Sequence, residues 1–374
     1  MSEAHHPLGA SGAARRNACT ASVGLQQAFP ETEESEASRE GTATHWASVE
    51  VWQGRPVVVG SVAPNGVVVD EEMIEAVELY VGHLRSIVDV FPIDQAHLEE
   101  TLPNERIYPG VFTTPDFWLF RPAVLYIREL KYGHGYVEVF ENAQLIDQAA
   151  AIIDALGIDG HAEQFLEVDF GIVQPRSFHR DGPIRTWRCR MTDLRGHINY
   201  SSGQAHEAMG PEAKYRAGGH CDHCSGRHVC PVAQRESYRA ADLARVSTPI
   251  ELPPEAIGLE LQTLERAQAI LEARISGLKG QAIALERQNI DVPFYRMEQG
   301  EGRERWVPEK AAEVLAICDL LGHDVRKKDA LVTPKQARRL GVDASVISAY
   351  SETPRGEWKL VPDTTTKAAK VFKP

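Results

Sequence analysis

The sequence predicts an α/β protein, because a strand pair is followed by a helix and a long helix comes later in the chain. Residues 117–130, FWLFRPAVLYIREL, have the composition of two strands that turn at Arg121-Pro122-Ala123. Apolar residues recur at helical spacing over residues 145–156, and every seven residues over 257–285. A chain of 374 residues has room for two or three domains.

Composition narrows the cellular location and the kinds of partner. No stretch approaches the roughly 20 apolar residues that a membrane-spanning helix needs, and residues 1–17 lack the apolar core of a signal peptide. We therefore expect a cytoplasmic protein with no membrane contact. A net charge of −13 argues against a general nucleic-acid coat. Basic residues outnumber acidic ones after residue 303, so any nucleic-acid contact is expected to be local.

Three cysteines within ten residues predict a metal site. Soft thiolates select zinc or iron–sulfur clusters over magnesium. The reducing cytoplasm also favours metal ligation over disulfides. The three are Cys221, Cys224 and Cys230.

The fourth ligand of this site has two interpretations. His223 or His228 would complete a local zinc site of three cysteines and one histidine. Alternatively, the far upstream Cys19 supplies a fourth thiolate, and four cysteines suit an iron–sulfur cluster. The remaining Cys189 and Cys318 have surroundings typical of small buried residues.

A carboxylate and a lysine end the second predicted strand. Alternate residues of a strand share a face, so Glu129 and Lys131 are expected to lie side by side. Asp116 comes just before the first strand, and the hairpin would bring its carboxylate to the same end. Two carboxylates beside a lysine are typical of a Mg²⁺ or Mn²⁺ site that activates water. A Glu-x-Lys triplet alone is more often a solvated strand face, so this interpretation depends on its surroundings.

Helices are expected to bring further polar residues to these carboxylates. Gln144 begins the helix after the strand pair, and Gln148 lies one turn later. His45 lies on an expected helix after Gly41, and imidazole is a common metal ligand. The acidic run 30–40 before it is expected to be a mobile loop.

Taken together, the ordered motifs resemble the PD-(D/E)xK nuclease superfamily, specifically its RecB-like branch with an iron–sulfur cluster. The resemblance covers about residues 10–370 and is strongest for an uncharacterised phage- and prophage-encoded family. The matching motifs, in order, are Cys19, residues 41–45, Pro115-Asp116, Glu129-Leu130-Lys131, Gln144, Cys221, Cys224 and Cys230.

The resemblance implies a restriction-endonuclease-like core, with a mixed sheet flanked by helices, and roles for the matching residues. Lys131 would orient the attacking water, and Gln144 would hold the lysine or the scissile phosphate. The catalytic metal ligands would be His45, Asp116, Glu129 and the backbone carbonyl of Leu130.

The resemblance also implies a 4Fe-4S cluster bound by all four motif cysteines. One cysteine precedes the nuclease core and three follow it, so the cluster would close the core like a clip. The chain departs from the family at Gln148, where relatives often have a tyrosine. The ligands of the cluster would be Cys19, Cys221, Cys224 and Cys230.

The implied function is that of a metal-dependent DNA exonuclease that uses Mg²⁺ or Mn²⁺. Its expected substrate is single-stranded DNA, in phage recombination, replication or repair within the bacterial host cytoplasm, and a recombination or replication protein is a candidate partner. Trp118, Tyr132 and Tyr136 flank the site and are candidates for base stacking, although such residues are more often core. The alternative is a non-catalytic DNA-binding or assembly module with a structural zinc site.

The domain boundary is predicted near residue 245. Residues 1–245 would form the nuclease domain closed by the iron–sulfur cluster, and residues 246–374 a mainly helical, basic C-terminal region. The heptad repeat over 257–285 predicts a coiled-coil-like seam that packs on the nuclease domain or on a second copy.

Overall fold

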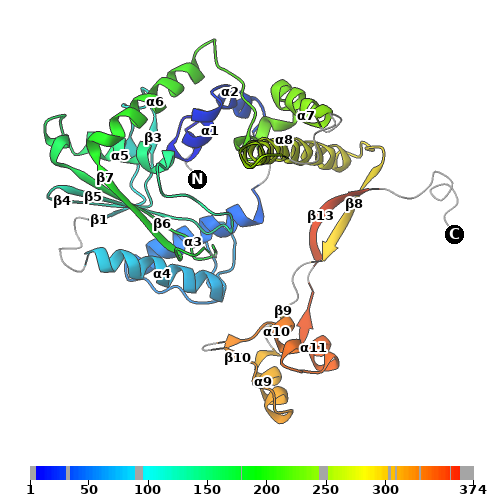
Figure 1. Cartoon of the computed structure of the whole chain (residues 1–374). Helices are drawn as coiled ribbons and strands as arrows, with labels where there is room; N and C mark the ends of the chain where they lie inside the picture. Colours follow the sequence, from blue (N-terminus) through cyan, green and yellow to red (C-terminus); the bar gives the residue numbers. More distant parts are fainter. Residues whose placement is uncertain are drawn as a thin grey trace. The chain divides into compact units, whose positions relative to one another are not determined.

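Two compact units make up the chain in the computed structural model (Figure 1). They are Met1–Gly277 and Leu278–Pro374. The structure describes residues 6–362 except 31–33, 89–95, 178, 244–251, 302–304, 308–309, 328–329 and 354. The predicted boundary at residue 245 lies outside the described residues.

A five-stranded sheet in the order β1-β4-β5-β6-β7 forms the centre of the first unit. β5 and β6 run parallel, and the other neighbours run antiparallel. The predicted α/β class, with a mixed sheet flanked by helices, is therefore confirmed. The strands are β1 (Ala96–Leu98), β4 (Phe117–Arg121), β5 (Val124–Leu130), β6 (Glu167–Val173) and β7 (Ile184–Arg190); β2 (Leu102–Pro103) and β3 (Phe112–Thr113) form a separate short ladder.

The predicted hairpin is formed by β4 and β5. Arg121 pairs with Val124 at the turn, where Ala123 adopts a positive φ of 68°. Phe117 pairs with Arg128, which places Asp116, the preceding residue, level with Glu129 at the open end of the hairpin. The register of this one hairpin therefore brings the two carboxylates together.

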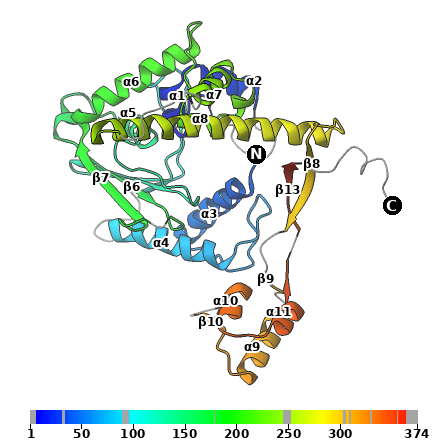
Figure 2. The ribbon, with the colours of Figure 1, turned by 45° about the vertical axis from the view of Figure 1, so that its right-hand side comes forward.

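Helices cover both faces of this sheet (Figures 1 and 2). On one face, Leu125 and Ile127 of β5 pack in a cluster with residues of α5 and α6. On the other face, Leu130 packs with Tyr80 and Leu84 of α4. Because residues alternate along a strand, Glu129 shares the face of α5. The helices are α3 (Glu36–Trp52), α4 (Glu71–Val88), α5 (Ala143–Ala155) and α6 (Met191–Met209).

The N-terminal segment is tied to the core by a buried ion pair. Arg16 donates to a carboxylate oxygen of Asp147 on α5 at 2.7 Å, and also to the backbone oxygen of Leu8 and the hydroxyl of Ser201 on α6. The Arg16 and Asp147 side chains are each only 1% exposed. The segment comprises η1 (Ala10–Gly12), α1 (Ala13–Ala18) and α2 (Ala21–Ala28).

Two predictions about the helices need correction. The acidic run 30–40 is not all loop, because α3 begins at Glu36, where the Ser35 side chain accepts a hydrogen bond from the Ser38 amide. Residues 31–33 of that run lie outside the described residues. Helix α8 (Pro254–Arg287) is unbroken, but its heptad seam does not pack on the nuclease domain as one alternative predicted, because it is largely exposed, at Ile257, Leu261, Leu264, Ile275 and Leu278; packing on a second copy stays a prediction.

Helix α8 instead packs through the opposite side. Ile270 and Ala273 form a small buried cluster with Cys221. Gly277 lies so near the cysteine loop that a Cβ there would be 2.8 Å from the Arg227 side chain and 3.0 Å from the His228 amide. The loop contains η4 (Gly219–Cys221) and η5 (Ser225–His228), and α7 (Pro231–Leu243) follows it.

The second unit has its own small core, formed by Val314, Cys318, Val325, Ala337, Val342 and Ile347. Its described residues mix short helices with two-stranded ladders. The strand pairs are β8 (Tyr295–Glu301) with β13 (Arg355–Pro362), β9 (Arg305–Trp306) with β12 (Ser351–Glu352), and β10 (Arg326–Lys327) with β11 (Ala330–Leu331). The helices after α8 are α9 (Ala311–Leu320), α10 (Pro334–Arg339) and α11 (Ala344–Tyr350).

We expect Arg16→Leu to lower the free energy of unfolding by about 3–5 kcal/mol, because Asp147 would stay buried without a cation. An Arg16→Leu/Asp147→Leu double variant should regain much of that loss. The matched control is Arg188→Leu, which breaks the half-exposed pair with Glu167 and should cost about 1 kcal/mol or less. Urea denaturation measures all three, and equal losses in the Arg16 and Arg188 variants would contradict the role given to the buried pair.

Candidate functional site

The residues predicted to be catalytic meet in one cavity of about 750 Å³. The N-terminal segment, α3, the hairpin and α5 all contribute to its wall. The predicted residues that line it are His45, Asp116, Glu129, Leu130, Lys131 and Gln144, and they are joined by Glu99 and Gln148.

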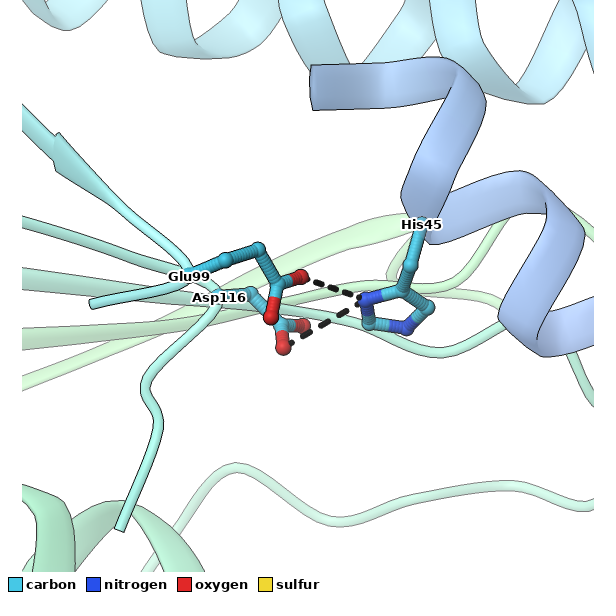
Figure 3. Close-up of side chains that lie close together, drawn as sticks. All are labelled: His45, Glu99 and Asp116. Carbon is cyan, nitrogen blue, oxygen red and sulfur yellow. Dashed lines mark hydrogen bonds and ion pairs between the residues drawn. The ribbon is translucent and has the colours of Figure 1, made fainter. Parts of the chain in front are cut away.

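One ring nitrogen of His45 faces two carboxylates, those of Glu99 and Asp116, as Figure 3 shows. Its Nδ1 atom is 3.0 Å from Oε1 of Glu99 and 3.4 Å from Oδ1 of Asp116. One ligand atom from each residue lies within 4.8 Å of the others, and this is the one such His/Cys/Asp/Glu group among the described residues. The three side chains are thus close enough to bind one ion together.

Glu99 is the member of this group that sequence reasoning missed. It follows the short strand β1, whose residue Leu98 pairs with Phe117 of β4, and its amide donates to the carbonyl of Asp116. Its φ of 48° lies in the left-handed region, which is uncommon outside glycine and is often found at functional sites. No motif in the sequence marks it, because only the β1–β4 pairing brings it beside Asp116.

Glu129 is held by three side chains from β5 and α5. Lys131 donates to its Oε1 at 2.8 Å, where Gln144 also donates, and Gln148 donates to its Oε2 at 2.9 Å. Lys131 donates to the Gln144 carbonyl oxygen as well, at 3.0 Å. Gln148 is buried, and its own carbonyl oxygen has no hydrogen-bond partner among the described residues.

The two carboxylate oxygens of Asp116 have different partners. Oδ2 accepts a hydrogen bond of 2.6 Å from the amide of Leu130, while Oδ1 faces His45. The Leu130 amide is therefore seen to position a carboxylate. The metal-binding role of the Leu130 carbonyl stays a prediction.

The charges in this cavity are strongly coupled. Burial and the nearby charge of Glu129 hold the pKa of Asp116 well above its usual value. Burial alone would lower the pKa of His45, but the carboxylates of Asp116, Glu99 and Glu129 outweigh it and raise that pKa to about 9. Burial would also lower the pKa of Lys131, but the charges of Glu129 and Asp116 outweigh burial and raise that pKa above its usual value. The cavity thus favours cations.

A second, smaller cavity is lined by all four motif cysteines, Cys19, Cys221, Cys224 and Cys230. Each is buried and not in a disulfide. The amides of Arg216, Gly218 and Ala233 point at the sulfurs of Cys19, Cys221 and Cys230, at 3.4, 3.4 and 3.5 Å. His223 and His228 do not line this cavity. The distant Cys19 therefore joins the three clustered cysteines.

The other two cysteines lie apart from this group. Cys189 is on β7, and Cys318 is buried in the core of the second unit.

Of the three aromatic residues predicted as candidates for base stacking, only Tyr132 lines the catalytic cavity. Trp118 is only 4% exposed and stacks on His97 at 3.8 Å. Tyr132 lines the cavity but is 3% exposed, and the Arg176 guanidinium covers its ring. Tyr136 is exposed but lies outside the residues that line the cavity.

Comparison with known proteins places the whole chain in one family. A family model described as "Protein of unknown function (DUF2800)" matches residues 5–368. The chain belongs to the DUF2800 family. A search of curated proteins returns no significant match.

None of the described helices is long and apolar enough to cross a membrane.

We expect two buried aspartates to respond oppositely to neutralisation when EDTA removes divalent ions. Asp116→Asn should raise the thermal midpoint by a few degrees, because it removes one of several neighbouring carboxylate charges. Asp147→Asn should lower it, because Arg16 loses its buried counter-charge. Differential scanning calorimetry measures both. A midpoint that falls in the Asp116 variant as in the Asp147 variant would contradict this electrostatic picture.

Proposed function

We propose that this protein is a metal-dependent nuclease that hydrolyses phosphodiester bonds of DNA. The observation that carries the proposal is the convergence of Asp116, Glu129 and Lys131 with His45 in one cavity. The sheet layered between helices, and the hairpin that aligns Asp116 with Glu129, support a restriction-endonuclease-like core of the PD-(D/E)xK superfamily. We assign the chain to the RecB-like branch on the order of its motifs.

The donor set fits a hard divalent ion. Carboxylate oxygens suit Mg²⁺ or Mn²⁺, and here they outnumber the single imidazole. The ligands would be His45, Asp116 and Glu129, with Glu99 as an addition to the predicted set and the Leu130 carbonyl retained as a candidate.

Charge balance explains why a cation is needed before DNA can bind. Among the described residues that line the cavity, Glu99, Asp116 and Glu129 supply three carboxyl groups, and Lys131 and His45 supply two cationic groups beside them. A phosphate that approaches this floor meets closely spaced carboxyl oxygens, and its repulsion by those that are ionised is strong where water is scarce. A bound divalent ion would offset this repulsion and also polarise the phosphate and activate a water.

The remaining steps fall to side chains of this chain. Lys131 has three N–H donors, of which Glu129 and Gln144 accept two, so a third is left to orient the attacking water. Gln144 and Gln148 keep Glu129 in place through amide hydrogen bonds. The attacking water forms a bond to phosphorus and releases a proton to solvent, the bond from phosphorus to the 3′ oxygen breaks, and that oxygen takes up a proton from solvent.

We further propose that Cys19, Cys221, Cys224 and Cys230 bind a 4Fe-4S cluster. A zinc ion about 2.3 Å from each sulfur would hold the sulfurs roughly 3.8 Å apart. No three of these four described sulfurs lie mutually within 4.8 Å, which favours a larger group than one zinc ion. The cluster would join the N-terminal segment to the loop before α7 and so close the nuclease core, which residues 1–245 would contain.

The expected substrate is single-stranded DNA, and the expected setting is phage recombination, replication or repair. Exonuclease action and a recombination or replication protein as partner belong to the same proposal, because they follow from the family resemblance. The protein would then act in the cytoplasm of the bacterial host.

Cleavage of end-labelled DNA with Mn²⁺ tests the enzyme. We expect wild-type protein to degrade single-stranded DNA, and Lys131→Ala to lose about 10²-fold or more, because no ammonium orients the water. Lys214→Ala is the control, since Lys214 pairs with Glu207 away from the cavity and should leave the rate unchanged. Activity that is the same in the Lys131 variant, or no cleavage by any Mn²⁺-loaded preparation, would refute the proposal.

Iron content after anaerobic purification tests the cluster. We expect about four irons per chain with visible absorption, and loss of both in Cys19→Ser as in Cys221→Ser, because each supplies one ligand. Cys318→Ser is the control, because Cys318 lies in the core of the second unit. A colourless protein that contains zinc, or a Cys19 variant with full iron content, would overturn the assignment.

A further inference from the structure

The catalytic cavity has an aromatic wall that the proposed chemistry does not use. His6 and Phe112 meet edge to face, with ring centroids 5.7 Å apart. Trp46 lines the same cavity from α3, one residue after His45. These rings come from three separate segments, yet all border the cavity whose floor holds Asp116 and Glu129.

The aromatic wall is fixed in place by local contacts. The His6 ring nitrogen Nδ1 accepts a hydrogen bond of 3.1 Å from the Leu8 amide, and the Gly9 amide donates to the His6 carbonyl at 2.7 Å. A Cβ on Gly9 would lie 3.0 Å from that carbonyl, so this turn is tight. The Arg16 guanidinium also donates a hydrogen bond to the Leu8 carbonyl. The rings are therefore preorganised before a ligand enters.

Trp46, on α3, is anchored by apolar contacts. It is half-buried and packs against two apolar clusters, which contain Ala43 and Met73 in one and Ala47 and Val77 in the other. An indole that is fixed along one edge loses little conformational freedom when another ring stacks on it. The wall of the cavity thus carries aromatic rings from three segments, together with the carboxylates of Asp116 and Glu129.

The size and depth of the cavity limit what can reach its floor. A volume of about 750 Å³ is typical of a small-molecule site. The side chains of Asp116 and Glu129 are only 8% and 4% exposed, so a phosphate must enter the cavity to touch them. A nucleotide that remains paired and stacked in a duplex is held away from such a floor. The geometry therefore favours an unpaired nucleotide.

We propose that His6, Trp46 and Phe112 form a stacking site for an unpaired nucleobase next to the scissile phosphate. The expected ligand is single-stranded nucleic acid. Because every base has a π-face that can stack on an aromatic ring, we expect the site to bind different sequences with similar affinity. This inference rests on the proposed nuclease function for the position of the phosphate, and it names the residues that select single strands. It replaces Trp118 and Tyr136, which the sequence suggested, with residues that line the cavity.

Fluorescence of 2-aminopurine tests the stacking site without cleavage. A short DNA strand with 2-aminopurine at one of its terminal positions is titrated into the full-length Lys131→Ala protein with Ca²⁺, and a matched RNA strand and a fully paired DNA duplex are run beside it. We expect quenching with a single strand and little with the duplex. RNA that quenches as well as DNA would show that the site reads bases and not the sugar, which the proposal also expects.

Apolar variants separate stacking from folding. Trp46→Leu and Phe112→Leu should each weaken binding about tenfold and reduce quenching, whereas Tyr136→Leu, at an exposed ring outside the cavity, should change neither. Thermal midpoints are measured for each, and His6→Leu supplies an independent test if one variant fails to fold. Unchanged binding and quenching in folded Trp46, Phe112 and His6 variants, or equal quenching with duplex, would overturn the stacking site.

The two proposals fail separately in these experiments. If the protein quenches the probe but does not cleave DNA with Mn²⁺, the stacking site is supported and the nuclease function is refuted. If the folded aromatic variants cleave single-stranded DNA as efficiently as the wild-type protein, the nuclease function is supported and the stacking site is refuted.

Discussion

Confinement of three carboxylates in one cavity is the constraint on which the rest of this structure depends. Asp116, Glu129 and Glu99 would repel one another there, because burial weakens the screening by water. Around them the fold places groups that oppose this repulsion. His45 Nδ1 faces both Asp116 and Glu99, and Lys131 donates to Glu129. Such an arrangement is costly for stability and useful for binding a cation, as is common at functional sites.

The local parts of the site were predictable because they follow from short sequence periods. The strand alternation that places Glu129 beside Lys131, and the hairpin that returns Asp116 to them, need only two neighbouring strands. The helix that begins near Gln144 follows from apolar spacing, and Asn142 caps it. These elements are close in sequence, so local propensity and the turn at residues 121–123 determine how they meet.

What could not be predicted depends on contacts between distant segments. Glu99 lies on no recognisable pattern and reaches the site through the pairing of β1 with β4. Gln148 was read as a departure from a family motif, yet it donates to Glu129. The heptad seam of α8 is not the face that contacts the nuclease domain, because small residues on another side, such as Ala273 and Gly277, allow closer approach to the cysteine loop. Helical period alone does not say which face is buried.

The cysteine site and the catalytic cavity share one segment of chain, residues 6–19. Cys19 ends α1, Arg16 of α1 binds Asp147, and the residues before them line the cavity. Asp147 lies on α5 between Gln144 and Gln148, which position Glu129. A group bound by the cysteines would therefore hold the wall of the cavity as well as the ends of the core.

Anomalous scattering from crystals grown with Mn²⁺ tests the central claim most directly, with data collected at the manganese, iron and zinc edges. The account expects a manganese peak among His45, Asp116 and Glu129, and a separate iron peak among the four cysteines. No manganese at the carboxylates in crystals that hold the ion elsewhere, or zinc alone at the cysteines, would contradict it.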